Sequence, residues 1–288
     1  MSANTDSTLH LSLAGMNVQV RWCGVFPHIN VHARFGAYLV SPATPDLALD
    51  LTVDPDYRPE HPPRAVYPSP EVSVLPDGRI ELVRTSERVT WDPVGHTAVA
   101  RARPSSATLQ PVEDPTPMDT PLRELLACAL PARQGLLLHA SGYGDARGAV
   151  VFAAVSGGGK TTTARKLPPD GVLSDDQVAV RRLGDRWMAF ALPFVGEYRR
   201  ATRPYQGPLR ALVLLEKSTT GLRLARVPAP EATARALAHT VRFARGGDAG
   251  PLLALAADLC RQVPVWSLAL GLEEPVVPTL DALLGGSG

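Results

Sequence analysis

The chain has 288 residues, of which 45 % are hydrophobic and 20 % charged, a globular composition that excludes disorder of the whole chain. Its 29 lysines and arginines balance 28 acidic residues, so a net charge of +1 provides no field that would attract nucleic acid. Its 3 cysteines form no Cys-x-x-Cys pair and no run of about 18 apolar residues occurs, so we expect a cytoplasmic protein without a disulfide framework, zinc site or membrane span.

The first third of the chain is predicted to form short strands. Between Leu9 and Arg103, polar and apolar residues alternate in runs separated by turn residues, for example at 18–22 and 79–83. Asp77-Gly78 stands between two such runs, and this pair suits a tight hairpin because glycine adopts a positive φ at no steric cost. We therefore expect a small, mostly β unit.

A proline-rich stretch at 103–121 ends this pattern, because proline lacks the amide that strands and helix interiors use. We place the domain boundary there, with a β-rich N-terminal unit at 1–118 and a second domain at 119–288. The second domain is expected to open with a helix at 121–130, for which Thr120 is the expected cap.

The remainder of the chain combines two kinds of pattern. Short apolar runs are typical of buried strands, whereas apolar residues at helical spacing predict amphipathic helices. Together they predict an α/β domain, with a further hairpin at Gly184-Asp185. The expected strands are 136–140, 148–154, 172–174, 177–183, 187–192, 209–216 and 265–270, and the expected helices are 162–167, 229–244 and 251–261.

A glycine-rich loop follows the strand expected at 148–154, with the sequence Ala154-Val155-Ser156-Gly157-Gly158-Gly159-Lys160-Thr161. Glycines let a backbone approach phosphates closely and turn its amides inward. Lys160 can reach the β and γ phosphates, and the Thr161 hydroxyl can ligate the magnesium ion that bridges them. The loop therefore predicts a site for ATP and Mg²⁺. The expected nucleotide-binding residues are Ser156, Gly157, Gly158, Gly159, Lys160, Thr161 and Thr162.

The loop departs from the common pattern GxxxxGK[ST] at one position, because Ala154 stands where the first glycine is usual. Alanine fits there only if the backbone angle is an ordinary one. The alternative is a glycine-rich turn with an incidental lysine. The apolar strand before the loop and the helix after it favour the phosphate-binding interpretation.

Phosphoryl transfer needs a carboxylate for magnesium and often a base for the proton of the attacking hydroxyl. Asp175 and Asp176 follow a short apolar run, so a strand would present both at its carboxyl end. Adjacent residues of an extended segment point in opposite directions, which lets one face the metal or substrate and the other the loop. The alternative for this pair is a solvated turn.

Further candidates lie on either side of these motifs. Glu197 follows an expected strand and a glycine, where it is either a second magnesium carboxylate or a surface charge. His139 ends the strand before the loop strand, and a lone histidine there is either a site residue or a core or turn residue. Three arginines could clamp phosphates or solvate a loop, namely Arg199, Arg200 and Arg203.

The order of these motifs resembles that of the catalytic domain of HPr kinase/phosphorylase, with His139, the loop ending in Lys160-Thr161, Asp175-Asp176 and then Glu197-Tyr198-Arg199. The resemblance covers roughly residues 136–200. It implies an HPr kinase/PEP carboxykinase-like nucleotide-binding core, an enzyme that phosphorylates a serine, and an assembly of several copies.

The resemblance also implies roles for individual residues. Lys160 would be the loop lysine and Thr161 the magnesium hydroxyl. The Asp175-Asp176 pair would supply the acid/base group, with Asp175 directed toward the metal and Asp176 as the base. Glu197 would be a carboxylate linked to the metal, and His139 would be a catalytic-site residue.

The chain departs from that family at Ala154 and in Glu197-Tyr198-Arg199-Arg200, which lacks the family's glycine after the arginine. The family's phosphorolysis loop is not found. The β-rich N-terminal unit is more similar to that of HPr kinase-like proteins found with ribosomally made, modified peptides. Some of those proteins phosphorylate a peptide hydroxyl.

Three functions are therefore kept open. The first is a kinase that transfers the γ-phosphate of ATP to a serine hydroxyl of a peptide or small protein. The second is a kinase of a small-molecule alcohol or amino acid, and the third is a regulatory protein that holds ATP without transfer. The sequence does not name the acceptor, because specificity would lie in the front unit and in loops without a recognisable code.

Overall fold

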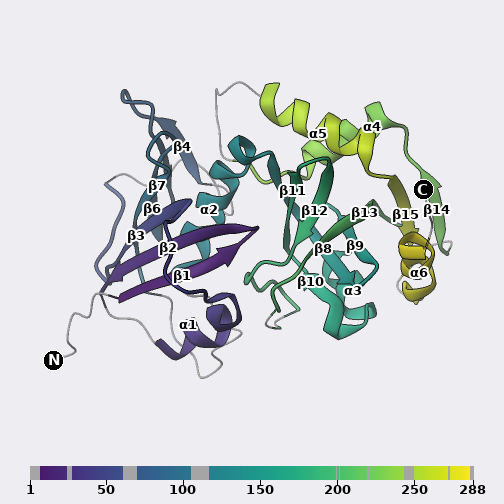
Figure 1. Ribbon diagram of the computed structural model, residues 1–288, viewed down its shortest axis with the longest axis horizontal. Helices are drawn as coiled ribbons and strands as arrows, with labels where there is room; N and C mark the ends of the chain where they lie inside the picture. Colours follow the sequence, from purple (N-terminus) through teal and green to yellow (C-terminus); the bar gives the residue numbers. More distant parts are fainter. Residues whose placement is uncertain are drawn as a thin grey trace. The chain divides into compact units, whose positions relative to one another are not determined.

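The computed structural model describes residues 7–24, 28–60, 70–104, 117–198, 200, 202–218, 221–242, 250–271 and 273–285 (Figure 1). For residues 28–30 only the backbone is described. The chain divides into two compact units, Met1–Ala129 with Arg242–Gly247, and Leu130–Val241 with Asp248–Gly288. Each unit contains a mixed β-sheet and α-helices, so the protein is of the mixed α/β class.

The first unit is built on a seven-stranded sheet with the order β1-β2-β3-β7-β6-β5-β4. The pairs β2–β3 and β3–β7 are parallel, and the other neighbours are antiparallel. Its strands are β1 (Ser7–Leu13), β2 (Met16–Cys23), β3 (Leu47–Val53), β4 (Glu71–Val74), β5 (Ile80–Val83), β6 (Glu87–Asp92) and β7 (Thr97–Ala102).

Alternating side chains form this sheet as the sequence predicts. Along β7, for instance, exposed and buried residues alternate without interruption, so one face of the strand is packed and the other is open. The hairpin between β4 and β5 turns at Gly78, whose φ is +85°. The predicted mostly β character of this region and its hairpin are thus confirmed.

Two helices belong to the first unit, α1 (His28–Phe35) and α2 (Asp119–Ala129). A buried ion pair joins them, with Arg34 Nη1 2.8 Å from Asp119 Oδ1. The helix α1 was not predicted, and α2 begins earlier than expected. Thr120 therefore lies inside the first turn of α2, and its predicted role as a cap is wrong.

The predicted boundary between residues 118 and 119 lies ahead of α2, whereas the compact first unit includes α2 and ends at Ala129. The reason is packing, because α2 contacts β3 and β6 of the first sheet. Most of the proline-rich stretch on which that boundary rested, at 105–116, lies outside the described residues.

The second unit is built on an eight-stranded sheet with the order β10-β8-β11-β12-β13-β15-β14, in which β9 pairs with both β8 and β13. Strands β9, β13 and β15 run parallel to one another. Its strands are β8 (Gly135–Asp145), β9 (Gly148–Ala153), β10 (Val172–Ser174), β11 (Gln177–Leu183), β12 (Arg186–Phe190), β13 (Gln206–Lys217), β14 (Arg223–Arg226) and β15 (Val265–Leu270).

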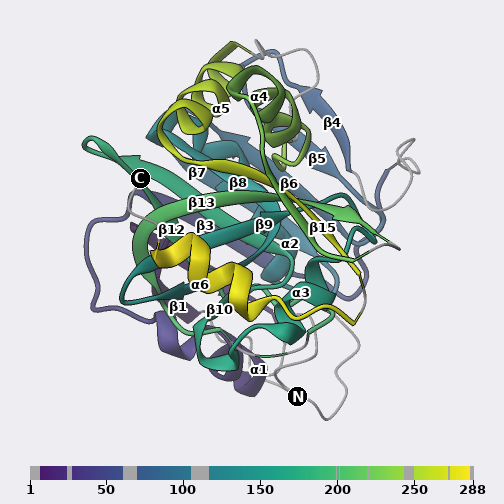
Figure 2. The ribbon, with the colours of Figure 1, turned by 90° about the vertical axis from the view of Figure 1, so that its right-hand side faces the viewer.

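Helices cover both faces of this second sheet, as Figures 1 and 2 show. On one face, α4 (Ala229–Ala238) and α5 (Gly250–Gln262) close a core that contains Leu138, Val151 and Leu212. On the other face, α3 (Lys160–Lys166) and α6 (Val277–Gly285) lie over a core that contains Phe152 and Val213. Burial on both faces explains why these strands are continuous apolar runs.

The predicted strands and helices of this unit correspond to observed ones, although the strand predicted at 187–192 ends at Phe190 and neither β14 nor α6 was predicted. The helix predicted at 229–244 ends at Ala238, because Thr240 forms an isolated bridge with Leu138 and the Val241 amide donates to the Leu137 carbonyl. Residues 243–249 lie outside the described part. Among the described residues, no helix combines the length and apolarity needed to cross a membrane.

Candidate functional site

A cavity of about 650 Å³ opens at the carboxyl ends of β9, β13 and β15, and all of its lining belongs to the second unit. This volume lies in the range of about 300–1,000 Å³ that is typical of ligand sites. In an α/β sheet this edge is where ligands bind. Every site residue expected from the sequence lines the cavity: His139, Ser156, Gly157, Gly158, Gly159, Lys160, Thr161, Thr162, Asp175, Asp176 and Glu197.

The glycine loop connects β9 to α3 and depends on its glycines. Gly157 and Gly159 have φ of +69° and +101°, a region that side chains disfavour. A Cβ on Gly158 would lie 2.7 Å from the Cβ of Ala154, so only glycine fits there. Ala154 is not among the described residues with positive φ, so its ordinary backbone angle explains why alanine is tolerated.

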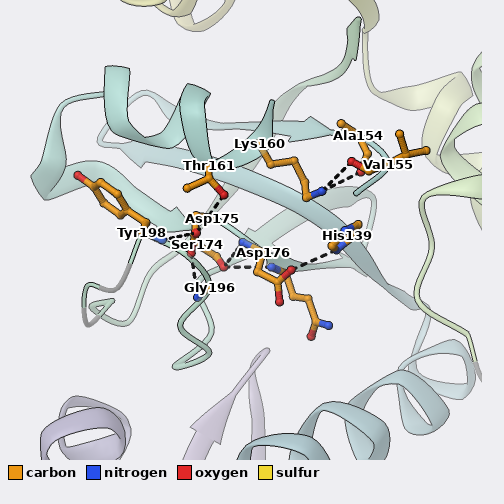
Figure 3. A network of polar contacts seen from close by, with 11 residues as sticks. His139, Ala154, Val155, Lys160, Thr161, Ser174, Asp175, Asp176, Gly196 and Tyr198 are labelled. Carbon is orange, nitrogen blue, oxygen red and sulfur yellow. Dashed lines mark hydrogen bonds and ion pairs between the residues drawn. The ribbon is translucent and has the colours of Figure 1, made fainter. Parts of the chain in front are cut away.

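Lys160 begins α3 and is buried, with 6 % of its surface exposed. Its Nζ donates to the carbonyls of Ala154 and Val155 at 3.1 and 3.0 Å, so the side chain folds back over its own loop (Figure 3). Burial lowers the pKa of Lys160, while Asp176, Glu197 and Asp175 act in the opposite direction. Lys160 therefore interacts electrostatically with all three acidic residues that the sequence proposed for the site.

Asp175 is buried and is held by the segment that follows β12. Its Oδ1 accepts the Gly196 amide at 3.0 Å and its Oδ2 accepts the Tyr198 amide at 2.7 Å. The Thr161 hydroxyl donates to Oδ2 at 3.4 Å, so the hydroxyl of the loop and this carboxylate face each other (Figure 3). A Cβ on Gly196 would lie 2.7 Å from the carboxylate oxygens, which requires glycine there.

Asp176 points away from Asp175 and toward His139, as the alternation of an extended segment predicts (Figure 3). The Nδ1 of His139 lies 3.2 Å from Oδ1 of Asp176, and both side chains are partly exposed, at 32 % and 27 %. The Ser174 hydroxyl accepts the Asp176 amide at 3.1 Å. The pair of aspartates therefore divides into a buried member beside Thr161 and an accessible member beside His139.

Glu197 lies at the mouth of this region and is exposed. Its backbone carbonyl accepts Arg165 Nη2 of α3 at 3.3 Å, which ties its segment to the helix after the loop. Of the arginines considered from the sequence, Arg199 lies outside the described residues. Arg200 stacks on the Tyr198 ring at 5.2 Å, and Arg203 is exposed and does not line the cavity.

The chemistry of these donors suits magnesium. Thr161 and Asp175 offer oxygen ligands that converge, and Glu197 lines the same cavity. Within the described part of the chain, no three His, Cys, Asp or Glu residues group closely enough to hold a metal ion by themselves. Magnesium binds through one or two carboxylates, with phosphate and water oxygens as its other ligands, so this sparse oxygen set fits it.

Sequence reasoning missed the far wall of the cavity, which consists of the ends of β13 and β15. Both strands were predicted, although their parallel pairing was not, and the rule that ligands lie at the carboxyl ends of parallel strands could have pointed to them. The lining residues from this wall are Leu215, Glu216, Lys217, Ser218, Leu270 and Gly271.

His239, just after α4, was also missed because nothing near it in the sequence suggests chemistry. Its carbonyl accepts the His139 amide at 2.8 Å. Burial lowers the pKa of His239, and nearby Arg235, Lys160 and His139 lower it further. The imidazole is therefore close to the site although it does not line the cavity.

No protein-family model matches the chain, and no curated protein sequence matches it.

Proposed function

We propose that this protein is an ATP-dependent kinase that transfers the γ-phosphate to a hydroxyl group, namely a serine of a peptide or small protein. One observation carries the proposal: the glycine loop with Lys160 and Thr161 shares a single cavity with a buried aspartate and an accessible Asp–His pair. The resemblance to HPr kinases in the order of these motifs supports it.

In this proposal the loop holds the phosphates of ATP. Its backbone amides and Lys160 would bind the phosphate oxygens, for which Lys160 would exchange its contacts with the carbonyls of Ala154 and Val155. Magnesium, held through Thr161 and Asp175, would neutralise the charge of the phosphates. The Gly196 and Tyr198 amides would keep Asp175 oriented.

Asp176 would accept the proton. The hydroxyl oxygen of the acceptor forms a bond to the γ-phosphorus, the bond from that phosphorus to the β–γ bridging oxygen breaks, and ADP leaves with the electron pair. The hydroxyl proton passes to the Asp176 carboxylate. His139 would keep that carboxylate oriented, since its Nδ1 lies 3.2 Å from Oδ1.

The test is to incubate the purified protein with Mg²⁺-ATP and serine-containing peptides, and to measure ADP release together with the mass of each peptide. We expect one ADP for each peptide that gains one phosphate. A parallel screen of free amino acids and small alcohols identifies the acceptor class. Nucleotide binding without turnover on any acceptor, unchanged in Asp176→Asn, would contradict transfer and favour a regulatory ATP-binding protein.

A further inference from the structure

The segment that holds Asp175 is not itself fixed by the core. Residues 191–198 form neither a helix nor a strand, and their burial ends at Phe194, which is fully enclosed. None of the residues that follow Phe194 in this segment is buried. Polar contacts therefore decide where the Gly196 and Tyr198 amides lie, and with them the carboxylate that accepts their hydrogen bonds.

One of these polar contacts comes from α3. The Glu197 carbonyl, which lies between the two amides that bind Asp175, accepts Arg165 Nη2 at 3.3 Å. Arg165 is exposed and lies in the last turn of α3. A charged donor makes a stronger hydrogen bond to a carbonyl than a neutral one does. Arg165 is therefore suited to hold the middle of the segment against the helix.

Thr161 lies on the same side of α3 as Arg165, because residues four positions apart in a helix lie one above the other. Its hydroxyl donates to Asp175 Oδ2 at 3.4 Å, and the same oxygen accepts the Tyr198 amide (Figure 3). The contacts thus form a closed chain, which runs from the first turn of α3 through Asp175 and its two amide donors back to Arg165 in the last turn. A shift of the segment would displace the carboxylate relative to Thr161.

We propose that Arg165 positions the carboxylate of Asp175 for magnesium: by holding the Glu197 carbonyl, it keeps the two neighbouring amides directed at that carboxylate. Arg165 itself does not line the cavity, so it acts through the segment and not on the substrate. The inference rests on the proposed function, because it takes Asp175 as a magnesium ligand. It adds a residue outside the cavity to those on which metal binding depends.

The test uses Arg165→Met, which removes the guanidinium and keeps an unbranched side chain with a high helix propensity. Calorimetric titration of ATP at a series of Mg²⁺ concentrations gives the half-saturating concentration of Mg²⁺. We expect it to rise about tenfold, the lower end of the loss that follows removal of a residue that orients a metal ligand. Affinity for ATP without Mg²⁺ should not change.

A second measurement reports on the segment directly and does not depend on any activity. Hydrogen exchange at the Gly196 and Tyr198 amides should become faster in Arg165→Met, because these amides lose the contact that keeps them directed at Asp175. Arg165→Lys retains a cation that can donate to the Glu197 carbonyl, so it should restore most of the protection and most of the affinity for Mg²⁺.

Arg210→Met is the matched control. Arg210 is likewise exposed, and its Nε donates to a backbone carbonyl, that of Arg147, at 2.8 Å, but it does not line the cavity. This variant should show the Mg²⁺ dependence and the amide exchange of the unmodified protein. The denaturation midpoint should stay nearly unchanged in all three variants, because substitutions of exposed side chains have small effects on stability.

The outcomes separate the two proposals. Unchanged exchange at Gly196 and Tyr198 in Arg165→Met would show that Arg165 does not hold the segment. Faster exchange with an unchanged Mg²⁺ dependence would show that the segment does not orient a metal ligand. Either result overturns the inference and leaves the proposed kinase standing. Failure of the folded, unmodified protein to bind ATP at any Mg²⁺ concentration would overturn the proposed function and the inference with it.

Discussion

The imidazole Nδ1 of His139 lies 3.2 Å from Oδ1 of Asp176, although the two residues are 37 positions apart in the sequence. Strand register brings them together, because Gln177 of β11 pairs with His139 of β8 and the Ala140 amide donates to the Asp176 carbonyl at 3.0 Å. An accessible carboxylate that is oriented by an imidazole suits a base for a hydroxyl proton.

Asp176→Asn is expected to lower the rate of phosphoryl transfer by about 10²–10⁴-fold, the usual contribution of a general base, and to leave ATP affinity nearly unchanged. Steady-state ADP release and calorimetry measure the two effects separately. Asp185→Asn, which changes a carboxylate that is 91 % exposed in the β11–β12 hairpin, is the control and should retain full activity. An active Asp176→Asn enzyme would show that another group accepts the proton.

Gly196→Ala is expected to displace the Asp175 carboxylate, because the new Cβ would lie 2.7 Å from both carboxylate oxygens. Overpacking of this kind costs about 1–3 kcal/mol in the free energy of unfolding, and activity should fall as well. Denaturant titration and ADP release are the measurements. Gly285→Ala, at a position where a Cβ meets nothing within 4 Å, should change neither. Full stability and activity of Gly196→Ala would contradict the close approach of the Gly196 backbone to the Asp175 carboxylate.

Thr161→Val is expected to weaken the binding of magnesium and ATP, because it removes a hydroxyl that faces Asp175 at 3.4 Å while keeping the volume of the side chain. Loss of a residue that merely orients a metal ligand typically costs about 10–100-fold in affinity, so at least tenfold is expected. Magnesium titration of ATP binding measures it.

The control for that substitution is Thr233→Val, whose hydroxyl donates within α4 to the Ala229 carbonyl at 2.8 Å. It should show the magnesium dependence of the unmodified protein. If Thr161→Val also showed that dependence, the hydroxyl would have no part in holding the metal.

His239 is expected to make the protein less stable as the pH falls below about 6.5. Burial lowers its pKa in the folded state, so the unfolded chain binds more protons at acidic pH and stability is lost as the pH falls through that region. His239→Gln should flatten the decline in denaturation midpoint between pH 7.5 and pH 5.5. His32→Gln, which changes an exposed imidazole of α1, is the control. If the denaturation midpoint of His239→Gln fell with pH as much as that of the unmodified protein, His239 would not be the cause of the acid instability.

Most strands of the second unit were predictable because their apolar runs are long and end at turn residues. The strand at 265–270 has the observed bounds, and the glycine loop was placed correctly between a strand and a helix. The helix predicted at 229–244 was too long, because tertiary contacts end α4 at Ala238. Just beyond that residue, Thr240 forms a β-bridge with Leu138 of β8. The helix α1 was missed because apolar residues at 29, 31, 33 and 35 alternate with polar ones, and this two-residue period is typical of a strand.

By itself, the sequence determined the residue types of the candidate site, because the loop glycines, Lys160 and the aspartate pair form local patterns with local physical reasons. The tertiary structure alone decided which of these groups meet. Strand register sets Asp176 beside His139, and close packing at Gly196 sets Asp175 beside Thr161. The far wall at Glu216 likewise exists only because β13 and β15 end side by side, a relation between distant segments that no local pattern encodes.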